Sequence, residues 1–245
     1  MIKTINNLYS WLRPLCLVVL LGACQSPACQ TAAPPETYLK TVKAELQKRW
    51  PDNRTVNIVF HGHSVPSGYF ATPVVRTLDA YPHLVLHGIK EKYPRAVVNV
   101  ITTSIGGEES EKGAQRFNEE VLNHRPDVIF IDYALNDRRI GLPRAKIAWE
   151  KMIAAARKAG TLVVLMTPSP DKKVDLMAPN STLEQHSRQI RQLAADHDLG
   201  LVDSYEAFQR AVLAGATVDE LMSTGNHPNE RGHYLIAGEL MKYFK

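Results

Sequence analysis

The chain has 245 residues, of which 29 are Lys or Arg and 25 are Asp or Glu, giving a formal net charge of +4 at pH 7. It contains three cysteines, too few for the disulfide framework of a small stapled scaffold. This modest charge also argues against a protein that binds a phosphate backbone, and the length is sufficient for one sizeable core.

Residues 1–23 have the features of an export signal. Lys3 and Arg13 occur without any acid, and an apolar stretch too short for a permanent membrane helix leads to small residues before Cys24. The segment Leu21-Gly22-Ala23-Cys24 resembles a bacterial lipobox, whose cysteine becomes the lipid-modified first residue of the mature chain. This resemblance implies a lipoprotein anchored through Cys24 to a membrane of the bacterial cell envelope, and secretion after ordinary cleavage is the alternative.

The chain that remains after export is nearly neutral. Loss of Lys3 and Arg13 leaves 27 basic against 25 acidic residues, which predicts no nucleic-acid partner. Residues 24–36 are polar and proline-bearing, as in a tether, so we expect one folded domain over residues 37–245. No cysteine follows Cys29, which excludes a Cys-based zinc site in that domain.

Helical and strand patterns alternate through the predicted domain. Amphipathic periodicity predicts helices at residues 38–50, 82–92, 108–122, 143–159, 182–196, 205–213 and 230–243. Apolar runs predict strands at residues 56–60, 97–102, 128–133, 162–166 and 199–203. Because parallel strands need crossover helices of this length, the pattern predicts an α/β fold with a five-stranded parallel sheet and helices on both faces.

Polar residues and glycines follow three of these strands and precede the last helix. Ser64 comes after the first strand, Gly107 after the second and Asn136 after the third, while His227 lies in the loop before the final helix. An open parallel sheet binds its ligand at the carboxyl ends of its strands. We therefore expect these four residues to converge.

Such a set can perform nucleophilic catalysis. His227 would take the proton of the Ser64 hydroxyl, and the N–H groups of Ser64 and Gly107 with the amide of Asn136 would form an oxyanion hole. Structural roles are the alternative, with Ser64 as a turn or cap residue and Gly107 as part of a tight turn. The nucleophile elbow Gly-x-Ser-x-Gly is not met, because Pro66 occupies the second glycine position.

At these residues the chain resembles the SGNH hydrolases, also called the GDSL esterase and lipase family. The four family blocks correspond, in order, to Gly62-His63-Ser64, to Gly107, to Ala134-Leu135-Asn136-Asp137 and to the segment from Thr224 to Asn229. The resemblance implies a flavodoxin-like three-layer domain and hydrolysis of carboxylic esters through an acyl-enzyme, without metal or cofactor. Small-molecule, glycan or lipid esters are the implied substrates, with O-acetylated saccharides favoured.

Three positions depart from the family pattern. His63 replaces the Asp of the first block, Ala134 replaces the Gly of the third, and Thr224 replaces the Asp that orients the catalytic histidine in the last. A threonine hydroxyl supplies no charge to a histidine ring. We therefore predict a dyad of Ser64 and His227, whose ring is oriented by the Thr224 hydroxyl or by a backbone carbonyl.

Other interpretations remain open from the sequence. Asp219, Glu220 or Glu230 could replace the missing acid. A surface lipoprotein with a decayed site, which binds glycans or lipids without catalysis, is the alternative function. A metal-dependent hydrolase is a further alternative, because His61 and His63 are two residues apart at a strand end and could share a zinc ion.

Overall fold

Five parallel strands form the central sheet of the computed structural model, which describes residues 31–245. The strand order is β2-β1-β3-β4-β5, with β1 at Thr55–Gly62, β2 at Val97–Thr102, β3 at Val128–Asp132, β4 at Leu162–Met166 and β5 at Gly200–Val202. From β1 the chain first moves to β2 on one side and then crosses to β3 on the other side. A crevice is expected at such a switch point, at the carboxyl ends of β1 and its neighbours. The prediction of five parallel strands is confirmed.

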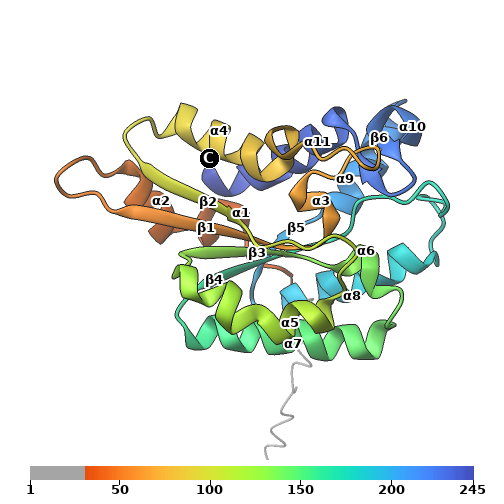
Figure 1. The fold of residues 1–245 in the computed structure, drawn as a ribbon, viewed down its shortest axis with the longest axis horizontal. Coiled ribbons are helices and arrows are strands. Elements are labelled where there is room, and N and C mark those ends of the chain that lie inside the picture. The colour runs from red at the N-terminus through yellow and green to blue at the C-terminus, as the bar shows by residue number, and fades with distance from the viewer. Residues whose placement is uncertain (1–30) are drawn as a thin grey trace, which may run out of the picture.

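Alternation of side chains along the strands produces two apolar cores. In β1, Ile58 and Phe60 pack into one core and Val59 packs into the other, as expected from the period of two residues in a strand. Helices cover both faces, which makes three layers (Figure 1). One face is covered by α2 Lys40–Gln47, α4 Tyr81–Lys92, α9 Ser204–Leu213 and α11 Glu230–Met241, and the other by α5 Ser110–Glu120, α7 Leu142–Lys158 and α8 Thr182–Asp196.

The remaining elements are short. Four helices have a single turn, namely α1 Pro35–Tyr38, α3 Ser64–Ser67, α6 Ala134–Asp137 and α10 Val218–Leu221. Three 3₁₀ turns lie at Thr77–Asp79, Leu122–His124 and Lys242–Phe244, and an antiparallel pair joins β6 Met222–Thr224 to β7 His227–Pro228. No helix within the described part of the chain is both long and apolar enough to cross a bilayer.

The packed domain begins earlier than the sequence predicts. Ala33 is buried, forms a parallel bridge with Gly200, and its N–H donates to the Leu199 carbonyl at 2.9 Å. Pro35 opens α1, because a missing N–H costs nothing in the first turn of a helix. The predicted tether over residues 24–36 is therefore too long at its carboxyl end. The predicted signal at residues 1–23, Cys24 and Cys29 lie outside the described residues.

Candidate active site

Ser64 stands at the start of α3, directly beyond the carboxyl end of β1. The last residue of β1, Gly62, can approach β3 closely because it has no side chain, and a Cβ on it would lie 2.4 Å from the Asp132 carbonyl. Pro66 is accommodated within the first turn of α3, where backbone N–H groups have no partner inside the helix. The His63 ring caps this turn by accepting from the Val65 N–H at 3.2 Å. Ser64 is thereby held at a helix N-terminus.

The structure brings the predicted nucleophile and base together. His227 Nε2 lies 2.9 Å from Ser64 Oγ, which is hydrogen-bonding distance. His227 was expected in a loop, but it begins β7, which pairs with β6 in a short hairpin. The hairpin holds the ring beside Ser64, because β7, which carries His227, contacts α3, which carries Ser64. Serine to imidazole contact at this distance permits proton transfer from the hydroxyl.

Neutral groups surround the second ring nitrogen of His227. Thr224 Oγ1 lies 3.4 Å from Nδ1 and donates to the Phe70 carbonyl at 3.3 Å. Because the hydroxyl hydrogen points to that carbonyl, the hydroxyl oxygen can accept from Nδ1–H, which leaves Nε2 unprotonated and able to act as a base. This arrangement matches the prediction that a hydroxyl or a backbone carbonyl orients the ring.

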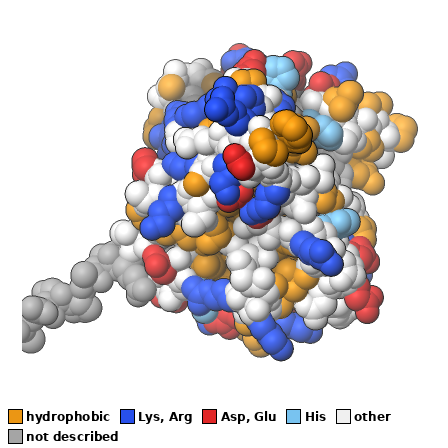
Figure 2. All heavy atoms as spheres, turned by 90° about the vertical axis from the view of Figure 1, so that its left-hand side faces the viewer, with side chains coloured by type: hydrophobic (Ala, Val, Ile, Leu, Met, Phe, Trp, Pro, Cys, Tyr) orange, Lys and Arg blue, Asp and Glu red, His pale blue; other side chains and the backbone are white. Residues whose placement is uncertain are grey.

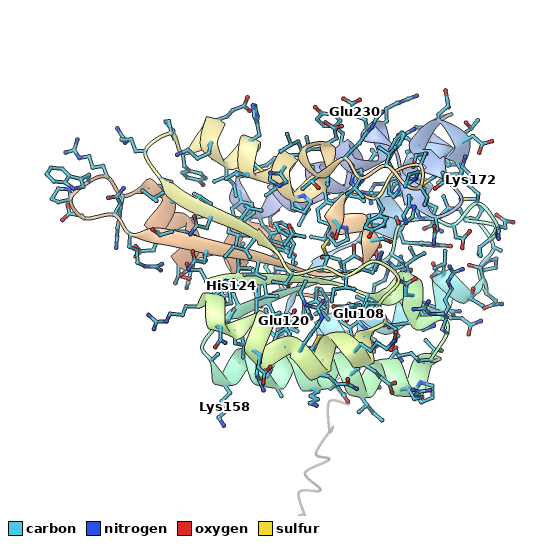
Figure 3. All side chains as sticks on the ribbon, viewed as in Figure 1. Glu108, Glu120, His124, Lys158, Lys172 and Glu230 are labelled. Carbon is cyan, nitrogen blue, oxygen red and sulfur yellow. The ribbon has the colours of Figure 1, made fainter. Side chains whose placement is uncertain are left out.

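The three acids considered as replacements are engaged or directed elsewhere. Asp219 is exposed and pairs with Lys172 at 2.7 Å. Glu220 caps α10 by accepting from the Thr217 N–H at 2.8 Å. Glu230 lies exposed at the start of α11, on the outer surface (Figure 3). Within residues 31–245, no carboxylate bonds to the His227 ring.

We therefore expect Asp219→Asn, Glu220→Gln and Glu230→Gln each to change kcat by less than about threefold, as for exposed charges remote from a reaction. Removal of a true orienting acid would lower kcat by about 10⁴-fold. Steady-state kinetics of the three purified variants distinguishes the two outcomes. A loss of a thousandfold or more in one of them would identify a hidden acid and reject the dyad.

The environment of His227 predicts the acid limb of the pH profile. Burial lowers the pKa of His227 from its ordinary value of 6.5, the nearby His63 ring lowers it further, and the Phe70 carbonyl opposes this shift. The base must be neutral, so kcat/KM is expected to fall only as the pH drops through a midpoint below 6.5. In Thr224→Asp the added carboxylate favours the imidazolium, which should move this midpoint upward by about one pH unit. An unchanged midpoint in the variant would show that position 224 does not face the ring.

The predicted oxyanion donors lie on connected backbone segments. The Ile105 N–H donates to the Gly62 carbonyl at 3.1 Å, so the segment carrying Gly107 runs beside the end of β1. Gly107 has φ 75°, a conformation that favours glycine, and open space lies where a Cβ would be. Asn136 Nδ2 donates to the Glu108 carbonyl at 2.9 Å, which leaves the second amide N–H for another acceptor.

A buried polar network that the sequence analysis did not identify fixes this segment. The Glu108 carboxylate accepts from Arg116 Nη2 at 2.6 Å and from the Tyr133 hydroxyl at 2.7 Å. Arg116 Nη2 also donates to the Thr103 carbonyl at 2.6 Å. The network ties Arg116 of α5 and Tyr133, the residue after β3, to the residue next to Gly107, so it positions the predicted oxyanion hole. Its only sequence signal is an acid and an arginine eight residues apart, which is weak.

His61 and His63, the candidate zinc ligands, each contact a different set of side chains in this domain. His61 contacts Thr103 Oγ1 at 2.9 Å and the Tyr133 hydroxyl at 3.2 Å, and burial beside the Arg116 charge lowers its pKa to about 3. His63 Nε2 lies 3.3 Å from Asp132 Oδ1. Within residues 31–245, no three His, Cys, Asp or Glu side chains are grouped as a metal site would require. The geometry therefore gives the zinc interpretation no support.

Comparison with known proteins agrees with this geometry. The sequence profile of the GDSL-like lipase/acylhydrolase family matches residues 60–235. An acetylxylan esterase from Geobacillus stearothermophilus is 27% identical over 165 residues, which are 61% of this chain and 74% of that protein.

Solved structures show the same fold. The crystal structure of an acetylxylan esterase from Geobacillus stearothermophilus superposes with a TM-score of 0.67 at 21% identity, covering 77% of this chain and 94% of that one. A two-domain esterase active on acetylated mannans superposes with a TM-score of 0.68 at 22% identity, covering 84% of this chain and 52% of that one. The chain thus spans about half of the two-domain protein, and the predicted three-layer fold is confirmed.

Proposed function

Because the chain belongs to the GDSL-like lipase/acylhydrolase family, a family of ester hydrolases, we propose that it removes O-acetyl groups from saccharides through an acyl-enzyme on Ser64. The observation that carries the assignment of residues is the 2.9 Å contact between Ser64 Oγ and His227 Nε2. The saccharide preference is supported by the relatives, which are described as esterases of acetylated xylan and mannan.

The proposed reaction has two symmetrical halves. Ser64 Oγ attacks the acetyl carbonyl while His227 Nε2 takes its proton, and the same nitrogen then returns the proton to the departing sugar hydroxyl. Water repeats the sequence on the acyl-enzyme and releases acetate. In both halves the negative oxygen would be stabilised by the N–H groups of Ser64 and Gly107 and by the Asn136 amide.

A substrate panel tests the proposal. The purified enzyme should release acetate from acetylated xylo- or manno-oligosaccharides with at least about tenfold higher kcat/KM than it shows for the matching butyryl esters. Comparable rates on long-chain lipid esters would reject the acetyl preference. Binding of an acetylated oligosaccharide without any turnover would instead support the decayed lipoprotein.

Tyr69 is the side chain that we propose limits the acyl group. Its ring centroid lies 5.9 Å from that of His227, and its hydroxyl would be 2.9 Å from a Cβ on Gly106. The ring therefore bridges the histidine and the segment of the predicted oxyanion hole. Tyr69→Ala is expected to raise the butyryl-to-acetyl ratio of kcat/KM by about tenfold, since each methylene in a pocket is worth about 1–3 kcal/mol. Tyr69→Phe keeps the ring and should leave the ratio unchanged, whereas an unchanged ratio in Tyr69→Ala would place the acyl group elsewhere.

We also propose that Cys24 carries a lipid anchor, which would keep the enzyme at the bacterial cell envelope, close to saccharide or other ester substrates there. The sequence of residues 21–24 after an apolar stretch supports this. Cells fed labelled palmitate should incorporate the label into the protein, and Cys24→Ala should abolish it. Incorporation into the Cys24→Ala variant would contradict the assignment.

A further inference from the structure

Trp50 protrudes from the end of the molecule opposite Ser64. It lies in the turn between α2 and β1, at the amino-terminal end of the sheet, and its side chain is 84% exposed. A tryptophan is rarely left in water, because its ring has a large apolar area and one N–H donor. This combination is typical of side chains at the boundary between water and lipid headgroups.

Exposed basic side chains share this end of the sheet with Trp50. Four exposed basic side chains lie shortly before β1, β2, β3 and β4, three of them in turns and Lys158 at the end of α7. None of them pairs with a carboxylate within residues 31–245: Arg49, Arg95, Arg125 and Lys158. Hydrogen bonds join the turns, since Asn53 Nδ2 donates to the Arg95 carbonyl at 3.3 Å and Asn57 Nδ2 to the Arg125 carbonyl at 3.4 Å. We call Trp50 and these four residues the Trp50 face.

Acids at this end only partly balance the charge. Asp127 is paired with Arg54 at 2.6 Å, while Asp52, Glu119, Asp196 and Asp198 are exposed acids near the strand starts. Lys92 and Arg157 are further exposed cations at this end, and neither pairs with a carboxylate within the described residues. Figure 2 shows this end of the molecule, with apolar side chains flanked by Lys and Arg. Figure 3 shows Lys158 and His124 here, while Lys172 lies toward the opposite end of the sheet. The Trp50 face is thus locally cationic on a nearly neutral chain.

The chain also joins the domain at this end. Ala33 bridges Gly200, the first residue of β5, so the connection to Cys24 arrives at the amino-terminal end of the sheet. The nine Cα-to-Cα steps from Cys24 to Ala33 span at most about 30 Å, at about 3.5 Å per step. If Cys24 holds a lipid, Ala33 lies within that distance of the bilayer, and the end of the sheet that carries the Trp50 face is the end to which the anchor connects.

We propose that the Trp50 face docks on an anionic membrane surface, with the Trp50 ring at the headgroup level and the four cations against lipid phosphates. Docking at this end would separate Ser64 from the bilayer surface by about 26 Å. This is the length of the eight-residue strand β1 at about 3.3 Å per residue. The active site would then face the envelope polymers rather than the lipids. The inference concerns orientation and rests on the proposed export, not on the identity of the ester.

Tryptophan fluorescence provides a direct test. The exported chain, residues 24–245, contains only Trp50 and Trp149, and Trp149 is fully buried with its N–H bonded to Asp137 at 2.7 Å. Unlipidated protein of this length should bind vesicles of brominated phosphatidylglycerol and phosphatidylcholine, with quenching of the Trp50 emission. Brominated phosphatidylcholine alone should quench little, and added salt should release the protein. Trp50→Phe should remove the quenchable emission and retain that of Trp149.

Matched variants distinguish binding through the Trp50 face from a general effect of net charge. Arg95→Gln should weaken binding to the anionic vesicles by about fivefold, the effect of about one cation near such a surface. Lys173→Gln removes the same charge from the opposite end and should leave binding unchanged. Equal losses in both variants, absence of Trp50 quenching on anionic vesicles, or quenching by soluble oligosaccharide instead of lipid would each overturn the proposal. Palmitate labelling of Cys24 and turnover of soluble esters are measured separately, so failure of the anchor or of the esterase assignment is distinguishable from failure of docking.

Discussion

Ser64→Ala is expected to lower kcat by about 10⁴- to 10⁶-fold, the largest effect of any substitution in this chain. Within residues 31–245 the hydroxyl is the only hydrogen-bond partner of His227 Nε2, so we expect no second nucleophile to replace it. A fluorophosphonate probe should label the wild-type enzyme at Ser64 and fail to label the variant. Residual activity of the variant should come from the oxyanion donors and substrate binding alone.

Ser67→Ala is a matched control for this prediction. Ser67 belongs to the same turn of α3, and its hydroxyl donates weakly to the His63 and Ser104 carbonyls, both at 3.4 Å. Removal of the Ser67 hydroxyl should change kcat by less than about threefold. The variant therefore controls for any disturbance of α3 that a serine-to-alanine change causes. Probe labelling of Ser64→Ala at the wild-type rate, or esterase activity that disappears with a chelator and returns with zinc, would show that Ser64 is not the nucleophile.

The sheet could be predicted from the sequence because each strand carries its own signal. The runs around Ile58, Ile129 and Val164 are apolar on both faces, and only a parallel sheet covered by helices buries both. The end of β1 could be predicted from Gly62, because the polar residues His63 and Ser64 follow this glycine and interrupt the apolar run. The convergence of Ser64 and His227 follows from topology, since both lie at one end of that sheet.

Contacts between distant segments could not be predicted in this way. The Phe70 carbonyl accepts from the Thr224 hydroxyl beside the His227 ring across 154 positions of sequence, and a carbonyl has no sequence signature. Glu108 looks like the first residue of a helix, yet α5 begins at Ser110 and the carboxylate turns inward to Arg116. Ala33 looks like part of a polar tether, and its partner is Gly200 at the start of the edge strand β5. Local composition carries no information about these partners.

Asn136→Ala is expected to lower kcat by about 100- to 1000-fold with little change in KM, as for loss of one oxyanion donor. The amide already donates one N–H to the Glu108 carbonyl at 2.9 Å, and this bond fixes the side chain before substrate arrives. The second N–H would meet charge only when the carbonyl oxygen becomes an oxyanion. Binding of the neutral ester therefore loses little when the amide is removed.

Asn136→Asp distinguishes a donor from a turn former. Asp and Asn favour the same local turns, but a carboxylate accepts hydrogen bonds and cannot donate to the Glu108 carbonyl or to an oxyanion. If Asn136 acts through its N–H groups, Asp should be at least as damaging as Ala, because it adds negative charge beside the developing one. Unaltered kcat in either variant would reduce Asn136 to a structural residue of α6, and thermal unfolding of both proteins would show whether any loss of rate arises from instability instead.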